Sequence, residues 1–216
     1  AGVVTTNSTF NDPGYRMVDG VKIKCWKAGG HGHETFYQAV QNSCNPAFMD
    51  MSMGLGVERF YDFLTAFGFG NRTGVDIAGE EKGVLMNEES VKKVDLARMG
   101  FGQAVSAVIN GGALMEPRLV KALEFDDGTE QAYQEMEPVK VRQVISPATS
   151  EIMRDVLLSV VSEGSGKKAY IPGYRVGGKT GTAQKYNPGG GIKQGAVIAS
   201  FIGFAPAEDP QVVVLF

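Results

Sequence analysis

The stretch GYRVGGKTGTAQK, residues 173–185, fits two unrelated kinds of chemistry. Its first eight residues satisfy the phosphate-loop pattern, which is a glycine, any four residues, and then Gly, Lys and Thr. The triplet Lys179-Thr180-Gly181 within it is also a short motif that lines acyl-transfer sites. The residues on either side of the stretch decide between a nucleotide site and an acyl-transfer site.

The neighbouring sequence argues against a phosphate loop. Such a loop follows a buried strand and opens a helix whose N–H groups point at the phosphates. Residues 164–172, GSGKKAYIP, form no apolar strand, and the glycines and proline of residues 187–191 would break a helix. Residues 175–185 instead predict a strand, on which side chains alternate between two faces and glycines let a ligand lie close to the backbone.

Composition sets broad limits on the protein. A chain of 216 residues with 43% hydrophobic residues can bury one substantial core, so we expect one domain over residues 1–216. The net charge of −3 gives no electrostatic case for a nucleic-acid partner. Apolar runs fall short of the ~20 residues that span a bilayer. Two cysteines are too few for a disulfide scaffold.

The order of predicted elements indicates helices packed on a sheet. We expect at most one hairpin in the first thirty residues. The first predicted helix covers residues 34–41, and the second has Pro46 in its first turn and Asn45 as its cap. A third carries Phe60, Phe63, Leu64 and Phe67 and stops at Gly68. The longest runs from Ser146 to Gly164, with one face formed by Ile152, Met153, Val156, Leu157, Val160 and Val161. The predicted strands cover residues 118–125 with a turn at 126–128, and then 174–182, 195–204 and 211–216. Helices first and an antiparallel-looking sheet last predict an α/β fold.

A second short motif gives the acyl-transfer interpretation its weight. Ser43-Cys44-Asn45 falls upstream, in a break between two predicted helices. By itself a Ser-x-Asn triplet is common and reads equally well as a helix cap. Its value comes from its pairing, in this order, with Lys179-Thr180-Gly181 after a long interval.

Phrases throughout the chain resemble one family. They are NSCNPAF at 42–48, GEEKG at 79–83, GFGQ at 100–103, NGG at 110–112, VGGKTGTA at 176–183 and FIGFAP at 201–206. Together they resemble the transpeptidase domain of class B penicillin-binding proteins, most of all the sporulation-type branch. The resemblance implies the penicillin-binding protein/serine β-lactamase-like fold, an antiparallel sheet with packed helices, here incomplete at both ends.

The resemblance also implies an activity. In the family, a serine attacks the D-alanyl-D-alanine end of a peptidoglycan stem peptide, expels the last D-alanine and passes the acyl group to an amine on a neighbouring strand. The implied ligands are the stem peptide and β-lactam antibiotics, without a metal or organic cofactor. The implied location is an extracytoplasmic domain anchored to the cell membrane, beside a glycan-polymerising partner in the membrane.

Residue roles carry over onto the two motifs. Ser43 would relay a proton to the leaving nitrogen, and the amide of Asn45 would offer a donor and an acceptor to a peptide-like substrate. Lys179 would supply positive charge near Ser43 and near the substrate carboxylate. The strand segment Thr180-Gly181-Thr182 would bind the substrate, with hydroxyls on the carboxylate and the Thr182 N–H as half of the oxyanion hole.

The family's nucleophile motif, Ser-x-x-Lys, does not occur between Ala1 and Asn42. Two later matches, at 90–93 and 165–168, follow the Ser-x-Asn motif and are rejected for that reason. We therefore expect the chain to begin just past the nucleophile helix and to be inactive in acyl transfer by itself. The alternative is a catalytically inactive penicillin-binding-like sensor or scaffold.

One junction in the sequence departs from the family. The GFGQ and NGG phrases, which a helix-forming stretch separates in the family, are joined almost directly after Gln103. Either a deletion or a segment that the sequence leaves out would account for the short connection.

The two cysteines leave two interpretations open. Outside the membrane, Cys25 and Cys44 could form a disulfide that closes a loop of about twenty residues and tethers the Ser-x-Asn motif. Equally, Cys44 could be a small buried filler and Cys25 an unrelated loop residue. A zinc set with His31 and His33 is disfavoured by its loose spacing, so we expect no metal and histidines that face water.

Overall fold

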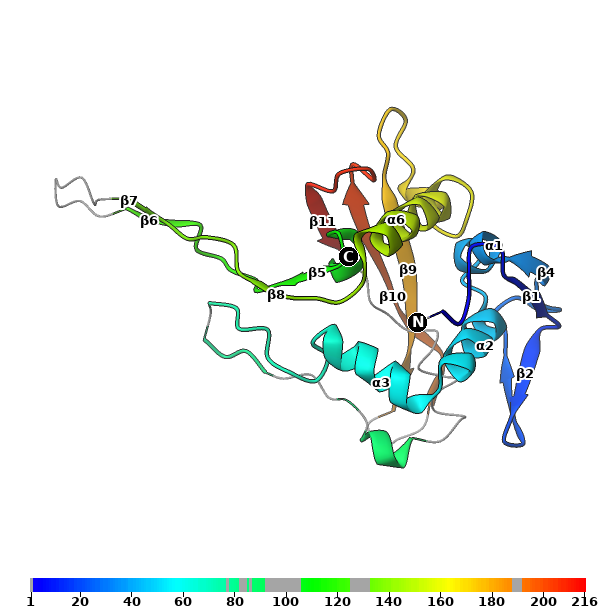
Figure 1. Cartoon of the computed structure of the whole chain (residues 1–216). Helices are drawn as coiled ribbons and strands as arrows, with labels where there is room; N and C mark the ends of the chain where they lie inside the picture. The colour runs from blue at the N-terminus through cyan, green and yellow to red at the C-terminus, as the bar shows by residue number, and fades with distance from the viewer. Residues whose placement is uncertain are drawn as a thin grey trace.

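The computed structural model describes residues 2–76, 78–81, 85, 87–91, 106–124, 133–187 and 192–216, and every structural statement concerns these residues. A central sheet carries the long helix α6 across one face, with the N-terminal strands and helices beside it (Figure 1). A narrow two-stranded ribbon, formed by β5 to β8, extends away from the opposite side (Figure 1).

The central sheet is antiparallel and has the order β11-β10-β9. Its strands are β9 (Gly177–Tyr186), β10 (Ile192–Ala205) and β11 (Val212–Leu215), which confirms the three strands predicted after the long helix. The Lys-Thr-Gly segment lies within β9, so a strand and not a helix follows Lys179. This excludes the phosphate-loop interpretation.

Helix α6 (Pro147–Ser162) packs on β9 and begins as predicted, with the Ser146 hydroxyl accepting the Thr149 N–H at 3.1 Å. Val156 and Val160 are fully buried. Ile152, one of the residues on the predicted apolar face, is 41% exposed. The reason is the helical period of 3.6 residues, which places Ile152 at the margin of the apolar stripe and brings Ser150, 0% exposed, toward its centre.

The N-terminal region contains two small antiparallel sheets. The predicted hairpin is β2 (Tyr15–Val18) with β3 (Val21–Lys24). The pairing of β1 (Thr9–Asp12) with β4 (Gly32–Thr35) was not predicted, because its partners are separated by the whole hairpin and no local turn signal joins them.

Three helices follow these strands: α1 (Phe36–Gln41), α2 (Asn45–Leu55) and α3 (Val57–Ala66). Helix α1 begins two residues later than predicted, because Glu34 and Thr35 stay in β4 and Thr35 forms a capping box with Gln38. Helix α3 ends just before Gly68, as predicted.

The remaining described elements are short. They are η1 (Glu88–Ser90), α5 (Ser106–Ile109), β5 (Ala113–Met115), β6 (Ala122–Glu124), β7 (Tyr133–Glu135), β8 (Lys140–Gln143) and η2 (Lys167–Ala169). Strand β6 is shorter than the strand predicted over 118–125, and the predicted turn at 126–128 lies outside the described residues, as does the junction after Gln103. Among the described residues, no helix combines the length and apolarity needed to cross a membrane.

One core cluster joins the N-terminal helices to helix α6, which packs on β9. Ala39 and Val40 of α1, Cys44 and Ala47 around the start of α2, and Val156 and Val160 of α6 pack together. At the end of α6 a Cβ on Gly164 would lie 2.6 Å from the Gln41 carbonyl oxygen, and the next N–H, of Ser165, donates to that oxygen at 2.8 Å. This contact fixes the end of α1 beside β9, which is where the two motifs meet.

Substitution Gly177→Ala should destabilise the fold, because a Cβ there would overlap the ring of Phe204, which is 2% exposed. Overpacking of this kind costs about 1–3 kcal/mol, measurable by urea unfolding. In Phe204→Leu, which makes room, the added cost of Gly177→Ala should be smaller than in the wild type. Equal costs in the two backgrounds would contradict the packing described here.

Candidate active site

Ser43 is held in an uncommon backbone conformation between α1 and α2. Its φ is +51°, in the left-handed region that costs a non-glycine residue energy. The N–H of Ser43 donates to the Val40 carbonyl at 3.1 Å, and the N–H of Cys44 donates to the Ala39 carbonyl at 2.9 Å. The chain therefore turns sharply after α1, and the buried Cys44 fixes the direction of the neighbouring Ser43 side chain.

Lys179 reaches Ser43 from the sheet. Its Nζ donates to the Ser43 hydroxyl at 2.8 Å and to the Thr180 carbonyl at 2.9 Å. The two motifs, 136 positions apart in sequence, are thus in direct contact, and the predicted proximity of Ser43 and Lys179 is confirmed.

Burial changes the protonation of Lys179. Removing the ammonium from water lowers the pKa of Lys179 from its ordinary value of 10.5 to about 8. A sizeable fraction of the side chain is therefore neutral at mildly alkaline pH. A lysine with such a pKa can both donate a proton to Ser43 and accept one from it.

The hydroxyls of Thr180 and Ser165 lie close to Lys179, and a tightly packed glycine follows Thr180 in β9. The Thr180 hydroxyl lies 3.5 Å from the Lys179 Nζ and 3.3 Å from the Ser165 hydroxyl. Gly181 is packed tightly, since a Cβ there would lie 2.6 Å from the Ser200 hydroxyl oxygen. Thr182, two residues beyond Thr180, is exposed.

Sequence reasoning missed Ser165 as part of this site. It considered Ser165 only as a nucleophile and rejected it, whereas the structure places its hydroxyl against Thr180. The signal was present in the glycines on both sides of Ser165: Gly164 lets the chain after α6 approach the backbone of α1, and Gly166 lets it fold back against Val160 of α6.

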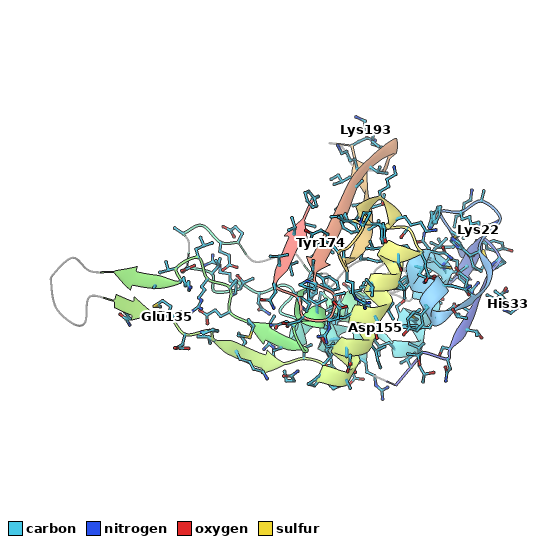
Figure 2. All side chains as sticks on the ribbon, turned by 90° about the horizontal axis from the view of Figure 1, so that it is seen from above. Lys22, His33, Glu135, Asp155, Tyr174 and Lys193 are labelled. Atoms are coloured by element: carbon cyan, nitrogen blue, oxygen red, sulfur yellow. The ribbon has the colours of Figure 1, made fainter. Side chains whose placement is uncertain are left out.

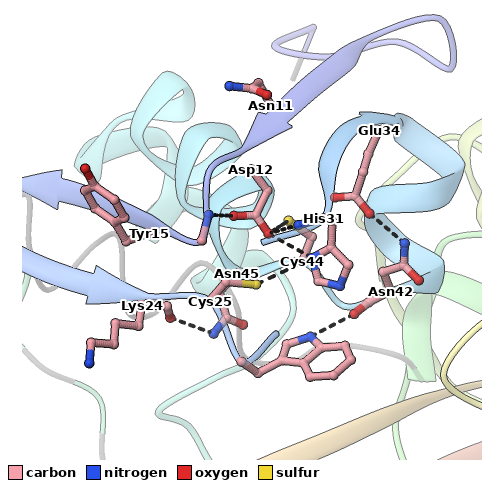
Figure 3. A network of polar contacts seen from close by, with 12 residues as sticks. Asn11, Asp12, Tyr15, Lys24, Cys25, His31, Glu34, Asn42, Cys44 and Asn45 are labelled. Atoms are coloured by element: carbon pink, nitrogen blue, oxygen red, sulfur yellow. Dashed lines mark hydrogen bonds and ion pairs between the residues drawn. The ribbon is translucent and has the colours of Figure 1, made fainter. Parts of the chain in front are cut away.

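Asn45 is placed differently from the prediction. It is the first residue of α2 and not its cap, because Cys44 occupies the cap position without a side-chain hydrogen bond. The Asn45 amide donates to the Lys24 carbonyl at 3.3 Å (Figure 3). Pro46 lies in the first turn of the helix, as predicted. Asn45 thus ties the Ser-x-Asn motif to the end of β3.

The two cysteines are free and buried. Together with Asp12 and His31 they form a cluster whose ligand atoms all lie within 4.8 Å of one another (Figure 3). The proposed Cys25–Cys44 disulfide is not formed in the structure, although the two thiols are close. The expected exposure of His31 is wrong, because its side chain is only 4% exposed.

Asp12 was overlooked in the sequence and forms the centre of this cluster. Its carboxylate accepts the Gly14 N–H at 2.7 Å and the His31 N–H at 2.9 Å. Burial opposes ionisation, but the hydrogen bonds from Cys25, Gly14 and His31 outweigh it and hold the pKa of Asp12 below its usual range. Burial, with the neighbouring carboxylates of Asp12 and Glu34, raises the pKa of the Cys44 thiol.

The remaining nucleophile candidate and the second histidine lie away from these groups. Ser90, in η1, is exposed, and its hydroxyl donates to the Asn87 carbonyl at 2.7 Å. His33 in β4 is exposed and points away from the body of the protein (Figure 2). The prediction that His33 faces water is confirmed.

An edge strand carrying Lys-Thr-Gly opposite a Ser-x-Asn loop is an arrangement of penicillin-reactive acyl-transferases. The sequence comparison agrees, since residues 1–216 match the family described as the penicillin binding protein transpeptidase domain. The chain belongs to this family.

Two curated relatives resemble the chain over nearly its whole length. The chain is 45% identical over 95% of its length to stage V sporulation protein D of Bacillus subtilis, covering 33% of that protein. It is 32% identical over 99% of its length to penicillin-binding protein PbpB of Mycobacterium tuberculosis, covering 34%. The chain thus spans about a third of these curated relatives.

Solved structures show the same fold. Penicillin binding protein 3 of Mycobacterium tuberculosis matches 99% of the chain with a TM-score of 0.87 and 30% identity, and the chain covers 52% of it. That protein has also been solved in complex with ampicillin, with the same TM-score. The transpeptidase domain from Eggerthella lenta matches with a TM-score of 0.83 and 29% identity, and the chain covers 55% of that structure. The penicillin-binding transpeptidase fold expected from the sequence is confirmed.

The buried Lys179 should make stability depend on pH. Between about 8 and 10.5, Lys179 is protonated in the unfolded chain but has lost its proton in the folded one, so stability should rise with pH there. Lys179→Met should lack this contribution, and its stability relative to the wild type should fall from pH 7 to pH 10 in urea titrations. Lys185→Met removes an exposed lysine from the same strand as the control. If the stability of the two variants changed with pH in the same way, the lowered pKa of Lys179 would be contradicted.

Proposed function

We propose that the chain supplies the second and third motifs of a serine D,D-transpeptidase site, which acts on D-alanyl-D-alanine stem peptides of peptidoglycan and is acylated by β-lactams. The observation that carries the proposal is the 2.8 Å hydrogen bond from Lys179 to the Ser43 hydroxyl. The names of relatives such as the peptidoglycan D,D-transpeptidase MrdA of Acinetobacter baumannii, 27% identical, support this substrate class.

In this proposal Ser43 and Lys179 move a proton together. When the nucleophile attacks the carbonyl, the leaving nitrogen needs a proton, and the Ser43 hydroxyl can give it while taking one from the Lys179 ammonium. A lysine pKa of about 8 keeps both protonation states accessible during one cycle. A β-lactam ring nitrogen would receive its proton by the same route.

The free edge of β9 suits a peptide substrate. In the described part of the chain, β9 pairs with β10 on one side only. The Thr180 carbonyl accepts from Lys179 at 2.9 Å, so the backbone groups of Thr180 face the free edge. Because backbone direction repeats every two residues along a strand, the Thr182 N–H faces it too. It can therefore serve as an oxyanion donor for a peptide aligned along this edge.

The nucleophile would come from a Ser-x-x-Lys motif outside these 216 residues. The two internal matches are unsuited to the role. The Ser90 hydroxyl already donates to its own turn, and the Ser165 hydroxyl is hydrogen-bonded to that of Thr180. We infer that the full protein is an enzyme, with Ser165 as a positioning residue for Thr180.

The relatives also guide the proposed location. We propose that residues 1–216 form one partial transpeptidase domain outside the cytoplasmic membrane, held by an N-terminal apolar anchor and working beside a glycan-polymerising partner. The name of stage V sporulation protein D favours a role in sporulation. A full-length sequence without an upstream apolar segment of about twenty residues would contradict the anchor.

Labelling with a fluorescent penicillin tests the activity. The full-length protein should form a covalent adduct, and the 216-residue chain alone should not, because it holds no suitable nucleophile. In the full-length protein, Thr182→Pro removes one backbone donor and should slow acylation by about 10²–10³-fold. Ser90→Ala should label at the wild-type rate.

Two results would overturn the proposal. Labelling of the bare chain at Ser90 or Ser165, located by mass spectrometry of the modified peptide, would reveal a nucleophile that we have dismissed. A full-length protein that carries no Ser-x-x-Lys motif and is not labelled would favour the sensor or scaffold.

A further inference from the structure

We propose that Asp12, Cys25, His31 and Cys44 form a four-coordinate Zn²⁺ site that fixes the Ser-x-Asn motif. The four residues come from the end of β1, the loop after β3, the position just before β4 and the cap position of α2. This inference revises the expectation of no metal. It differs from the zinc set weighed in the sequence by replacing the exposed His33 with the buried Asp12.

The spacing of the donor atoms suits a tetrahedral ion. The Asp12 Oδ2 lies 2.8 Å from the His31 Nδ1 and 3.4 Å from the Cys44 Sγ, and the Cys25 Sγ lies 3.5 Å from the same His31 nitrogen. Zinc bonds of ~2.0–2.3 Å at tetrahedral angles put neighbouring ligand atoms roughly 3.3–3.8 Å apart. The cluster, within 4.8 Å throughout, needs only small side-chain movements to reach these separations.

The donor set selects zinc. Two thiolates, an imidazole nitrogen and a carboxylate oxygen are the ligands that structural zinc sites use, whereas Ca²⁺ and Mg²⁺ require oxygen. Asp12, Cys25 and Cys44 are all buried, so water is largely excluded, as in closed structural sites. Arg16, which is ion-paired to Asp50, interacts electrostatically with Asp12 and Cys44 and offsets part of their negative charge.

The surroundings of the cluster show how its ligands are oriented. Backbone N–H groups of Gly14 and His31 hold the Asp12 carboxylate, leaving Oδ2 pointed at the thiols and the imidazole. Among the residues that the structure describes, the buried Nε2 of His31 has no hydrogen-bond partner, so the ring is held from its Nδ1 side. The ring of Trp26 packs edge-on against it at 5.2 Å between centroids. These contacts fix the orientation of the imidazole and of the carboxylate before any ion binds.

The cluster also has an unpaired carboxylate oxygen nearby. Glu34, 3% exposed, accepts the Asn42 amide on Oε1 at 2.6 Å, while its buried Oε2 has no hydrogen-bond partner in the described part of the chain. Glu34 neighbours the Cys44 thiol. An unsatisfied buried carboxylate oxygen is costly, and a divalent cation at the adjacent cluster would offset that cost.

A metal here would act on the proposed active site through the backbone. Cys44 is the residue between Ser43 and Asn45, and it caps α2 without a side-chain hydrogen bond. Bonding its sulfur to the same ion as Asp12, Cys25 and His31 would tie α2 to three segments of the N-terminal sheets. The strained backbone of Ser43 would then be held in place by a covalent-strength contact at the next residue.

The experiment measures metal directly in the full-length protein, purified under reducing conditions. We expect one zinc per chain by elemental analysis, and with Co²⁺ in its place the intense visible bands of a tetrahedral site together with thiolate charge-transfer absorption. His31→Ala should weaken zinc binding, measured against a chromophoric chelator, by more than the ~10–100-fold typical of losing a residue that only orients a ligand. His33→Ala, the matched control, should bind like the wild type.

A wild-type protein that binds no zinc at equimolar metal after full reduction, or a His31→Ala variant that retains wild-type affinity, would overturn the site. So would Co²⁺ spectra without thiolate bands. Zinc binding that is unchanged in a protein inactive toward penicillin would leave the site standing and count against the transpeptidase proposal alone. The wild-type spectrum requires no substitution and therefore does not depend on any variant folding.

Discussion

The hydrogen bond between Lys179 and Ser43 joins two parts of the chain that fold from different local signals. Lys179 lies on the edge strand β9 of the central sheet, and Ser43 lies in a sharp turn between the helices α1 and α2. A lysine that is largely removed from water needs compensating oxygen partners, and it finds them in the Ser43 hydroxyl and the Thr180 carbonyl. The site therefore exists only if α1 and α6 pack as they do.

Asp12 has a comparable role for the N-terminal strands. One carboxylate gathers two backbone N–H groups, an imidazole and a thiol from segments that have little apolar surface of their own. Strands of four residues with exposed faces are weak by themselves. A buried polar centre, whether or not a metal completes it, gives this region the fixed geometry that the Ser-x-Asn motif needs.

The sequence alone was sufficient to predict the structure where one hydrophobic periodicity or one motif dominated. The apolar stripe and Ser146 cap of α6, the three strands after it and the pairing of Ser43 with Lys179 could all be predicted. It was insufficient where distant residues decide the structure. The β1–β4 pairing has no local signal, and Asp12 becomes a site residue only through that pairing, which places it beside His31.

The prediction of the residue that caps α2 was wrong for a similar reason. Asn45 is a strong cap former, yet its amide is used by the Lys24 carbonyl, and the buried Cys44 takes the cap position. His31 looked like a water-facing loop residue among glycines, and only tertiary packing with Asp12 and Trp26 buries it. Tertiary contacts overrode local preference at both positions, and both lie at the candidate site.

The most direct test of the central claim, that Ser43 and Lys179 act as one proton-transfer unit, is a double-mutant cycle on the penicillin acylation rate of the full-length protein. Ser43→Ala, Lys179→Met and the double variant would be compared with the wild type under single-turnover conditions. The account predicts strong non-additivity, with the double variant about as slow as the slower single variant. Effects that multiply would show that the two residues act independently and would contradict the account.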